Sequence, residues 1–128
     1  MLANQGQANT TVVMVVAQSA ANTAAATSAW LDVRPSEGDL MIISNVGIVT
    51  AGTVTPTIED ATDGSGTGAA TITPNEGAFT VVTTSNDPLT EKRTVPASAI
   101  RGWIRYVGTV VTGPALVGVT LSSHPKYT

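Results

Sequence analysis

Alternating apolar and polar positions predict that the end of the chain, Arg101 to Ser123, forms two long β-strands. The even positions from Ile104 to Val110 are apolar or glycine, and so are the odd positions from Ala115 to Leu121. Successive side chains of a strand point to opposite faces, so each set indicates one buried face. A turn at residues 112–114 separates the two strands. They either pair directly or lie in opposite sheets, as neighbours in a jelly roll do.

Similar patterns upstream predict further short strands, separated by turn residues such as the Pro and Gly of the segment 34–38. The expected strands are residues 11–18, 28–33, 38–46, 53–59 and 77–84, with a brief one near 71–74 and an edge strand or extended crossing at 89–99. Residues 19–27 have no apolar stripe and are expected to form a loop or a lead-in. The spacing predicts an all-β, single-domain, jelly-roll-like β-sandwich of about eight short strands.

For three segments the sequence predicts more than the type of structure. The run 11–18 is apolar at both parities, which predicts a strand central in a covered sheet or capped by another subunit. Pro56 lacks the N–H that a strand ladder needs, so residues 53–59 are expected at a sheet edge. Residues 1–10 are small and polar and predict a flexible arm outside the sandwich of residues 11–128. In that arm Asn4, Gln5 and Gln7 are candidate partner-binding residues, with simple fraying as the alternative.

Composition narrows the class of protein. The chain has 128 residues, of which 12% are charged, about half of the usual ~25%. A surface so poor in charge favours oligomerisation or permanent docking. The net charge of −3 disfavours nucleic acid as a partner. No apolar run approaches the ~18 residues of a membrane span, and the run 12–17 is too short for a signal peptide.

Residues able to carry chemistry are few. There is no cysteine, and His124 is the only histidine, whereas a cupin-type enzyme needs several. The Asp/Gly loop 59–68 superficially resembles a calcium loop, but its spacing does not fit and a solvated turn is the simpler interpretation. The glycines of 64–68 lack the following helix and lysine of a phosphate-binding loop. We therefore expect a protein that is not an enzyme and has no cofactor.

Two tryptophans and a group of cations are the remaining candidates for a site. Trp30 is expected in the core, whereas the parity of Trp103, opposite Ile104 and Tyr106, favours an interface. Four of the six cations fall within fourteen positions and form a docking patch for an acidic protein surface or a solvated edge: Lys92, Arg93, Arg101 and Arg105. Arg105, between aromatic residues, is the best docking candidate.

The strand pair RGWIRYVGTVV and ALVGVTLSSHP resembles the C-terminal part of the decoration, or cement, proteins of tailed bacteriophage heads. The upstream order also fits, with ATSAW at 26–30, GDLMII at 38–43 and then an acidic Asp/Gly loop. The resemblance implies a virion protein that is assembled in the host bacterial cytoplasm and binds the outer surface of the capsid. It also implies a homotrimer that bridges subunits of the major capsid protein, with no membrane or nucleic acid as partner.

A binding module of another class stays open beside this interpretation. A lectin-like or fibre-associated sandwich would use a tryptophan together with the acidic loop, with calcium as a possible aid. An exposed tryptophan beside Asp60 or Asp63 would favour it.

Overall fold

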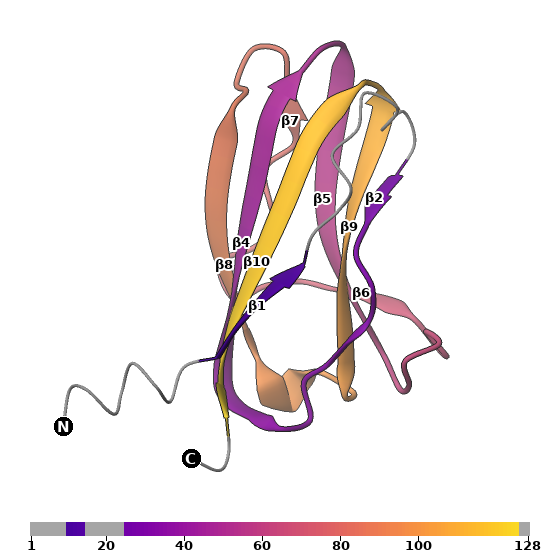
Figure 1. The fold of residues 1–128 in the computed structure, drawn as a ribbon, viewed down its shortest axis with the longest axis vertical. Coiled ribbons are helices and arrows are strands. Elements are labelled where there is room, and N and C mark those ends of the chain that lie inside the picture. Colours follow the sequence, from indigo (N-terminus) through magenta and orange to yellow (C-terminus); the bar gives the residue numbers. More distant parts are fainter. Residues whose placement is uncertain (1–9, 15–24, 126–128) are drawn as a thin grey trace, which may run out of the picture.

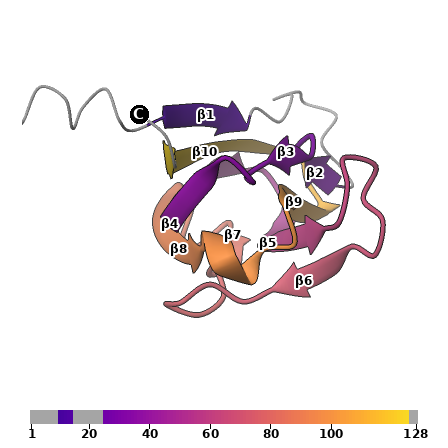
Figure 2. The same cartoon turned by 90° about the horizontal axis from the view of Figure 1, so that it is seen from below.

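The computed structural model describes the backbone of residues 10–14 and the complete residues 25–125, which form two antiparallel β-sheets packed as a sandwich (Figure 1). The first sheet has the order β1 (Thr10–Met14), β10 (Ala115–Pro125), β4 (Ser36–Val49) and β8 (Leu89–Pro96). The second has the order β2 (Ala25–Thr27), β9 (Trp103–Thr112), β5 (Gly52–Ala61) and β6 (Ala70–Ile72), with β3 (Leu31–Asp32) also on β9 and β7 (Val82–Thr83) also on β5. Figure 2 shows both sheets curving around a common core.

The strand order is jelly-roll-like. The short strands β2 and β3 share one position beside β9, and β6 and β7 share one beside β5, so ten described strands fill eight positions. Between consecutive described strands the chain passes to the other sheet, with three exceptions. These are β2 to β3 and β6 to β7, which share a position, and β5 to β6, which are neighbours in the second sheet. The predicted β-sandwich is thus confirmed. Strands β9 and β10, adjacent in the sequence, lie in opposite sheets.

The core follows the predicted parity of β9 and β10. Ile104 and Tyr106 of β9 are fully buried, and Val117 and Leu121 of β10 meet them from the other sheet. Each buried aliphatic side chain stabilises the fold by about 1.5–3 kcal/mol. The Tyr106 hydroxyl hydrogen-bonds Ser44 of β4 across the core at 3.0 Å, and burial raises the pKa of Tyr106 to about 12.

Two expectations about strand position are wrong. The proline-containing strand β5 is not an edge strand, because it pairs with β9 on one side and with β6 and β7 on the other. Pro56 is tolerated there because β7 and β6 pair with β5 only at residues 53–54 and 58–60, leaving Pro56 in the gap between them. The described part of the apolar run 11–18, in β1, lies at an edge of the first sheet, so the alternative of a central strand is wrong, whereas capping by another subunit stays a prediction. Residues 15–18 lie outside the described part.

The expected strand at 77–84 is reduced to β7, because the residues before it cover the edge of β8. The Asn75 amide donates to the Thr94 carbonyl at 2.9 Å, and the Glu76 carboxylate accepts from the Thr94 amide at 2.8 Å. In the same way the Glu91 carboxylate of β8 accepts from the Thr80 amide at 2.8 Å. Strand β8 is an edge strand, as one of the two predictions had it, and these contacts shield its exposed backbone groups.

Candidate functional site

The two ends of the sandwich differ in chemistry. We call the upper end in Figure 1 the aliphatic end; it consists of residues 47–54, 81–88 and 110–117. Its only charged residue is Asp87, whose carboxylate accepts a hydrogen bond from the Val49 amide at 2.7 Å. The lower end, which we call the charged end, consists of residues 30–39, 59–68 and 96–105.

Among the described residues, the large hydrophobic side chains with the greatest exposure lie at the aliphatic end. Ile48 is 58% exposed and Val111 57%, and Val81 and Leu116 are also exposed. Ile48 and Leu116 lie at a bulge, where the pairing of β4 with β10 shifts between Ala115 and Val117. The alternation in the sequence does not reveal this bulge, so sequence reasoning missed these residues. The uncharged stretches 40–58 and 106–123 were the available signal.

At the charged end, Arg101 and Asp60 form an ion pair with several hydrogen bonds. The Arg101 guanidinium donates to the two Asp60 carboxylate oxygens at 2.9 and 3.1 Å and to the Gly68 carbonyl at 2.6 Å. The Asp60 side chain is only 4% exposed, whereas that of Arg101 is 43% exposed. The hydrogen bonds from Arg101 hold the pKa of Asp60 below its ordinary value despite burial.

Two further arginines stack on the tryptophans of the charged end. Arg105 lies 4.5 Å from the ring centre of Trp30 and donates to Glu59 at 2.7 Å. Arg34 lies 5.4 Å from the ring centre of Trp103 and donates to both carboxylate oxygens of Asp32, whose pKa is lowered by these hydrogen bonds. Such cation–π contacts contribute about 0.5–1 kcal/mol each at exposed sites.

The expectation that Trp30 is a core residue is wrong. Trp30 is half-buried beside the Asp/Gly loop, since the chain leaves strand pairing between β2 and β3. A Cβ built on Gly66 would lie 2.8 Å from Nε1 of Trp30, and one built on Gly64 would lie 3.1 Å from the ring of Trp103. The two glycines therefore allow the loop to approach both indoles, which leaves neither tryptophan as an open platform.

The loop's carboxylates are engaged within the chain. Asp63 accepts hydrogen bonds from the hydroxyl and amide of Thr67 and from the Ser65 amide, and these bonds lower its pKa. Asp60 faces Arg101. Within residues 25–125, no three His, Cys, Asp or Glu side chains come together as a metal site would require. This geometry does not favour the pairing of an exposed tryptophan with Asp60 or Asp63 that a lectin-like module would use.

The structure separates the predicted docking residues. Trp103, Arg101 and Arg105 lie at the charged end on or beside β9, whereas Arg93 lies on β8 in the other sheet. Arg93 pairs with Glu91 at 3.0 Å and stacks 5.4 Å from the Phe79 ring centre. All four arginines of the chain therefore pair with a carboxylate of the same chain. Asn4, Gln5 and Gln7 lie outside the described residues.

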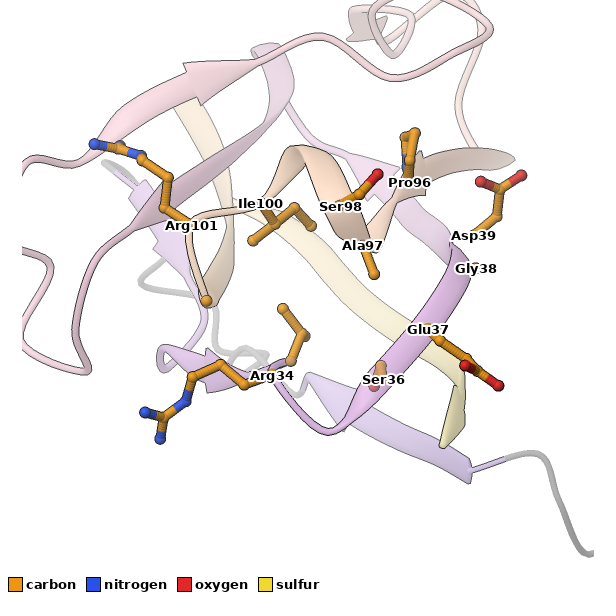
Figure 3. Close-up of a pocket in the computed structure, with 12 residues that line it drawn as sticks. Arg34, Ser36, Glu37, Gly38, Asp39, Pro96, Ala97, Ser98, Ile100 and Arg101 are labelled. Atoms are coloured by element: carbon orange, nitrogen blue, oxygen red, sulfur yellow. The ribbon is translucent and has the colours of Figure 1, made fainter. Parts of the chain in front are cut away.

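A hollow of about 620 Å³ opens at the charged end (Figure 3). It lies between the first residues of β4 and the 3-10 turn Ala97–Ala99. Its apolar lining includes Val33, Pro96, Ala97 and Ile100. The guanidinium groups of Arg34 and Arg101 point away from it on one side, and the carboxylates of Glu37 and Asp39 point away from it on the opposite side, beyond β4.

No model of a known protein family matches the chain, and no curated protein matches it. Among the described residues, no helix is long and apolar enough to cross a membrane.

Proposed function

We propose that this chain is a structural protein of a tailed-phage head, which binds the outer surface of the shell and bridges major capsid subunits. The observation that carries the proposal is the aliphatic end, where Ile48, Val81, Val111 and Leu116 are exposed on a surface almost without charge. Exposed apolar side chains gathered on a charge-poor surface mark a protein contact. The resemblance of residues 101–125 to decoration proteins names the partner.

The aliphatic end supports docking better than the cations that the sequence suggested. Arg93, Arg101 and Arg105 already pair with Glu91, Asp60 and Glu59, so an outside carboxylate would have to compete with bonds already made. Exposed aliphatic side chains have no such internal partner to lose. Trp103 and Arg105 then serve mainly to hold the loop and strands that shape the charged end.

The mechanism is burial of surface without chemistry. A stable interface removes about 800 Å² per partner from water, and a few central side chains carry most of its energy. A homotrimer would present three aliphatic ends at once, so modest contacts would add up through avidity. Such a protein needs a rigid scaffold and a charge-poor contact surface, and it needs no catalytic group.

Cosedimentation of the purified chain with undecorated heads tests the proposal, with light scattering to measure the oligomer. We expect saturable binding with a fixed number of copies per head. The matched variants are Val111→Lys at the aliphatic end, which should weaken binding, and Thr71→Lys on β6, which should leave it unchanged. A folded protein that never pellets with heads, or that binds equally well with Val111→Lys, contradicts the proposal.

A further inference from the structure

Two turns of the aliphatic end are hydrogen-bonded to each other. One joins β4 to β5 and the other joins β9 to β10, both at the upper end in Figure 1. The Gly113 amide of the second turn donates to the Ala51 carbonyl of the first at 2.9 Å. In the opposite direction, the Thr50 amide donates to the Pro114 carbonyl at 3.0 Å. These two bonds hold the turns of the two sheets together as one unit.

One residue of the β9–β10 turn has a backbone conformation that its side chain disfavours. Thr112 has a φ of +74°, and among the described residues no other non-glycine residue has a positive φ. The Gly113 amide also donates to the Val111 carbonyl at 3.1 Å, so Thr112 is the central residue of a γ-turn of the rare, strained kind. A β-branched residue at positive φ persists only where the surrounding structure holds it in place.

The facing strand holds this turn in place through a glycine. Gly52 of β5 lies opposite Thr112 in the register and has a φ of +77° itself. A Cβ built on Gly52 would clash with the Val111 carbonyl oxygen, so this carbonyl lies directly against the backbone of β5. The contact with Gly52 and the hydrogen bond to Ala51 therefore confine the γ-turn on both sides of Thr112.

Within the described chain, no hydrogen bond of the Thr112 side chain offsets this strain. The side chain is exposed, and its hydroxyl forms no hydrogen bond within residues 25–125. Glycine would adopt the same φ without strain, but beside Gly113 it would leave two consecutive glycines with many accessible conformations. Threonine narrows that range because its branched side chain is stiff. The result is a confined backbone directly after Val111, whose side chain is 57% exposed.

We propose that Thr112 is a positioning residue, which fixes the β9–β10 turn so that Val111 meets a docking partner in one orientation. A contact side chain that is already ordered loses less conformational entropy when it binds. The partner surface that fits is apolar and poor in charge, like the aliphatic end itself. The role in docking rests on the proposed function, whereas the order of the turn is a property of the free protein.

Amide NMR relaxation of the free protein measures this order in Thr112→Gly and Thr109→Gly. Thr109 is an exposed threonine of the same strand in regular pairing with β5, so its variant makes the same change outside the turn. We expect the order parameters of the Val111 and Gly113 amides to fall from about 0.85 to about 0.6 in Thr112→Gly alone. Thr112→Asn should keep them, because asparagine tolerates positive φ and still has a side chain.

Thermal unfolding of the same variants tests the strain. Thr112→Gly should raise the melting temperature by about 2 °C, because the strain released exceeds the freedom that glycine adds to the unfolded chain. Thr109→Gly releases no strain and should lower the melting temperature by about 5 °C. Equal losses in the two variants would overturn the proposal.

Cosedimentation with undecorated heads tests what the order is for. Thr112→Gly should bind about tenfold more weakly although it is more stable, and Thr112→Asn and Thr109→Gly should bind within about twofold of the unmodified protein. A purely structural residue would not move stability and binding in opposite directions.

An unchanged order parameter at Val111 in Thr112→Gly, or an unchanged affinity of this variant for heads, overturns the proposal. If the unmodified protein does not pellet with heads, the docking role falls together with the proposed function. The order parameters then still show whether Thr112 fixes the turn, so the two failures are distinguishable.

Discussion

The two ends of the sandwich use similar strands for different purposes. At the charged end, ion pairs and stacked side chains connect the strands, the loop and the turn. The ion pairs are Arg101–Asp60, Arg105–Glu59 and Arg34–Asp32. The register of β3 and β5 with β9 brings the residues of these pairs to the same end of the sandwich. At the aliphatic end, tight turns close the strands, and aliphatic side chains remain exposed. Charge here stabilises the protein's own fold, and the exposed apolar surface is the one that we propose for a partner.

The difference shows that residue type alone does not tell whether a side chain is free of partners within its own chain. Arginine and tryptophan are enriched where proteins bind each other, which made Trp103 and Arg105 attractive candidates. In the folded chain their partners come from positions far away in sequence, such as Glu59, which the register of β5 with β9 places opposite Arg105. The side chains of Ile48 and Val111 are aliphatic, so they form no ion pair within the chain, and both are more than half exposed.

The largest effect should follow removal of Arg101 from the charged end. Arg101→Met leaves the carboxylate of Asp60 buried without its cation, and we expect the melting temperature to fall by about 10 °C. Thermal unfolding by circular dichroism measures this. The matched control is Arg34→Met, which breaks an exposed pair with the same chemistry and should lower the melting temperature by no more than about 2 °C. Equal losses would mean that burial of Asp60 does not matter.

Next in size is a change at the aliphatic end. Introducing lysine at both Ile48 and Val111 should leave thermal stability nearly unchanged, because both side chains are more than half exposed. Binding to undecorated heads should weaken roughly a hundredfold, since two central contacts would be replaced by charge. Cosedimentation over a range of concentrations gives the affinity. If the affinity survives and stability falls instead, the aliphatic end belongs to the fold and not to an interface.

A smaller effect should separate the contact between loop and indole from backbone strain. Gly66 and Gly77 both have positive φ, +84° and +94°, so alanine is strained at each, by about 1 kcal/mol. Only at Gly66 would the new Cβ press on Trp30, whereas nothing lies within 4 Å of a Cβ at Gly77. We expect Gly66→Ala to cost about 1 kcal/mol more than Gly77→Ala in urea unfolding. Identical costs would show that the loop does not depend on Trp30.

The smallest effect is expected from acid, acting away from both ends at the covered edge of β8. Hydrogen bonds from the Thr94 amide and hydroxyl lower the pKa of Glu76. A carboxyl whose pKa is lower in the folded state stabilises the protein above its unfolded pKa, near 4.5, and loses this contribution as the pH falls through the folded value. Glu76→Gln should therefore reduce stability at pH 7 and have less effect near pH 3. An undiminished effect at pH 3 would rule out the ionised carboxylate as the cause.

Much of the sandwich could be predicted because burial leaves a period of two in the sequence. Parity identified the inward faces of β9 and β10 correctly, from Ile104 to Val110 and from Ala115 to Leu121. Proline was less informative, since Pro56 sits in a central strand at a gap between two short neighbours. The prediction that Trp30 lies in the core was wrong because its neighbours, Arg105 and Gly66, come from distant parts of the chain.

The sequence by itself determined that this protein is a β-sandwich with little charge, because alternation and composition are local properties that each strand carries. Only the tertiary structure decided what its few charges and exposed side chains do. Ion pairing depends on register, which brings Asp60 to Arg101 across 41 positions. Exposure of Ile48 and Leu116 depends on a bulge between strands far apart in sequence. Ion pairing and exposure both depend on how segments far apart in the sequence are placed in space, and no local sequence pattern contains that information.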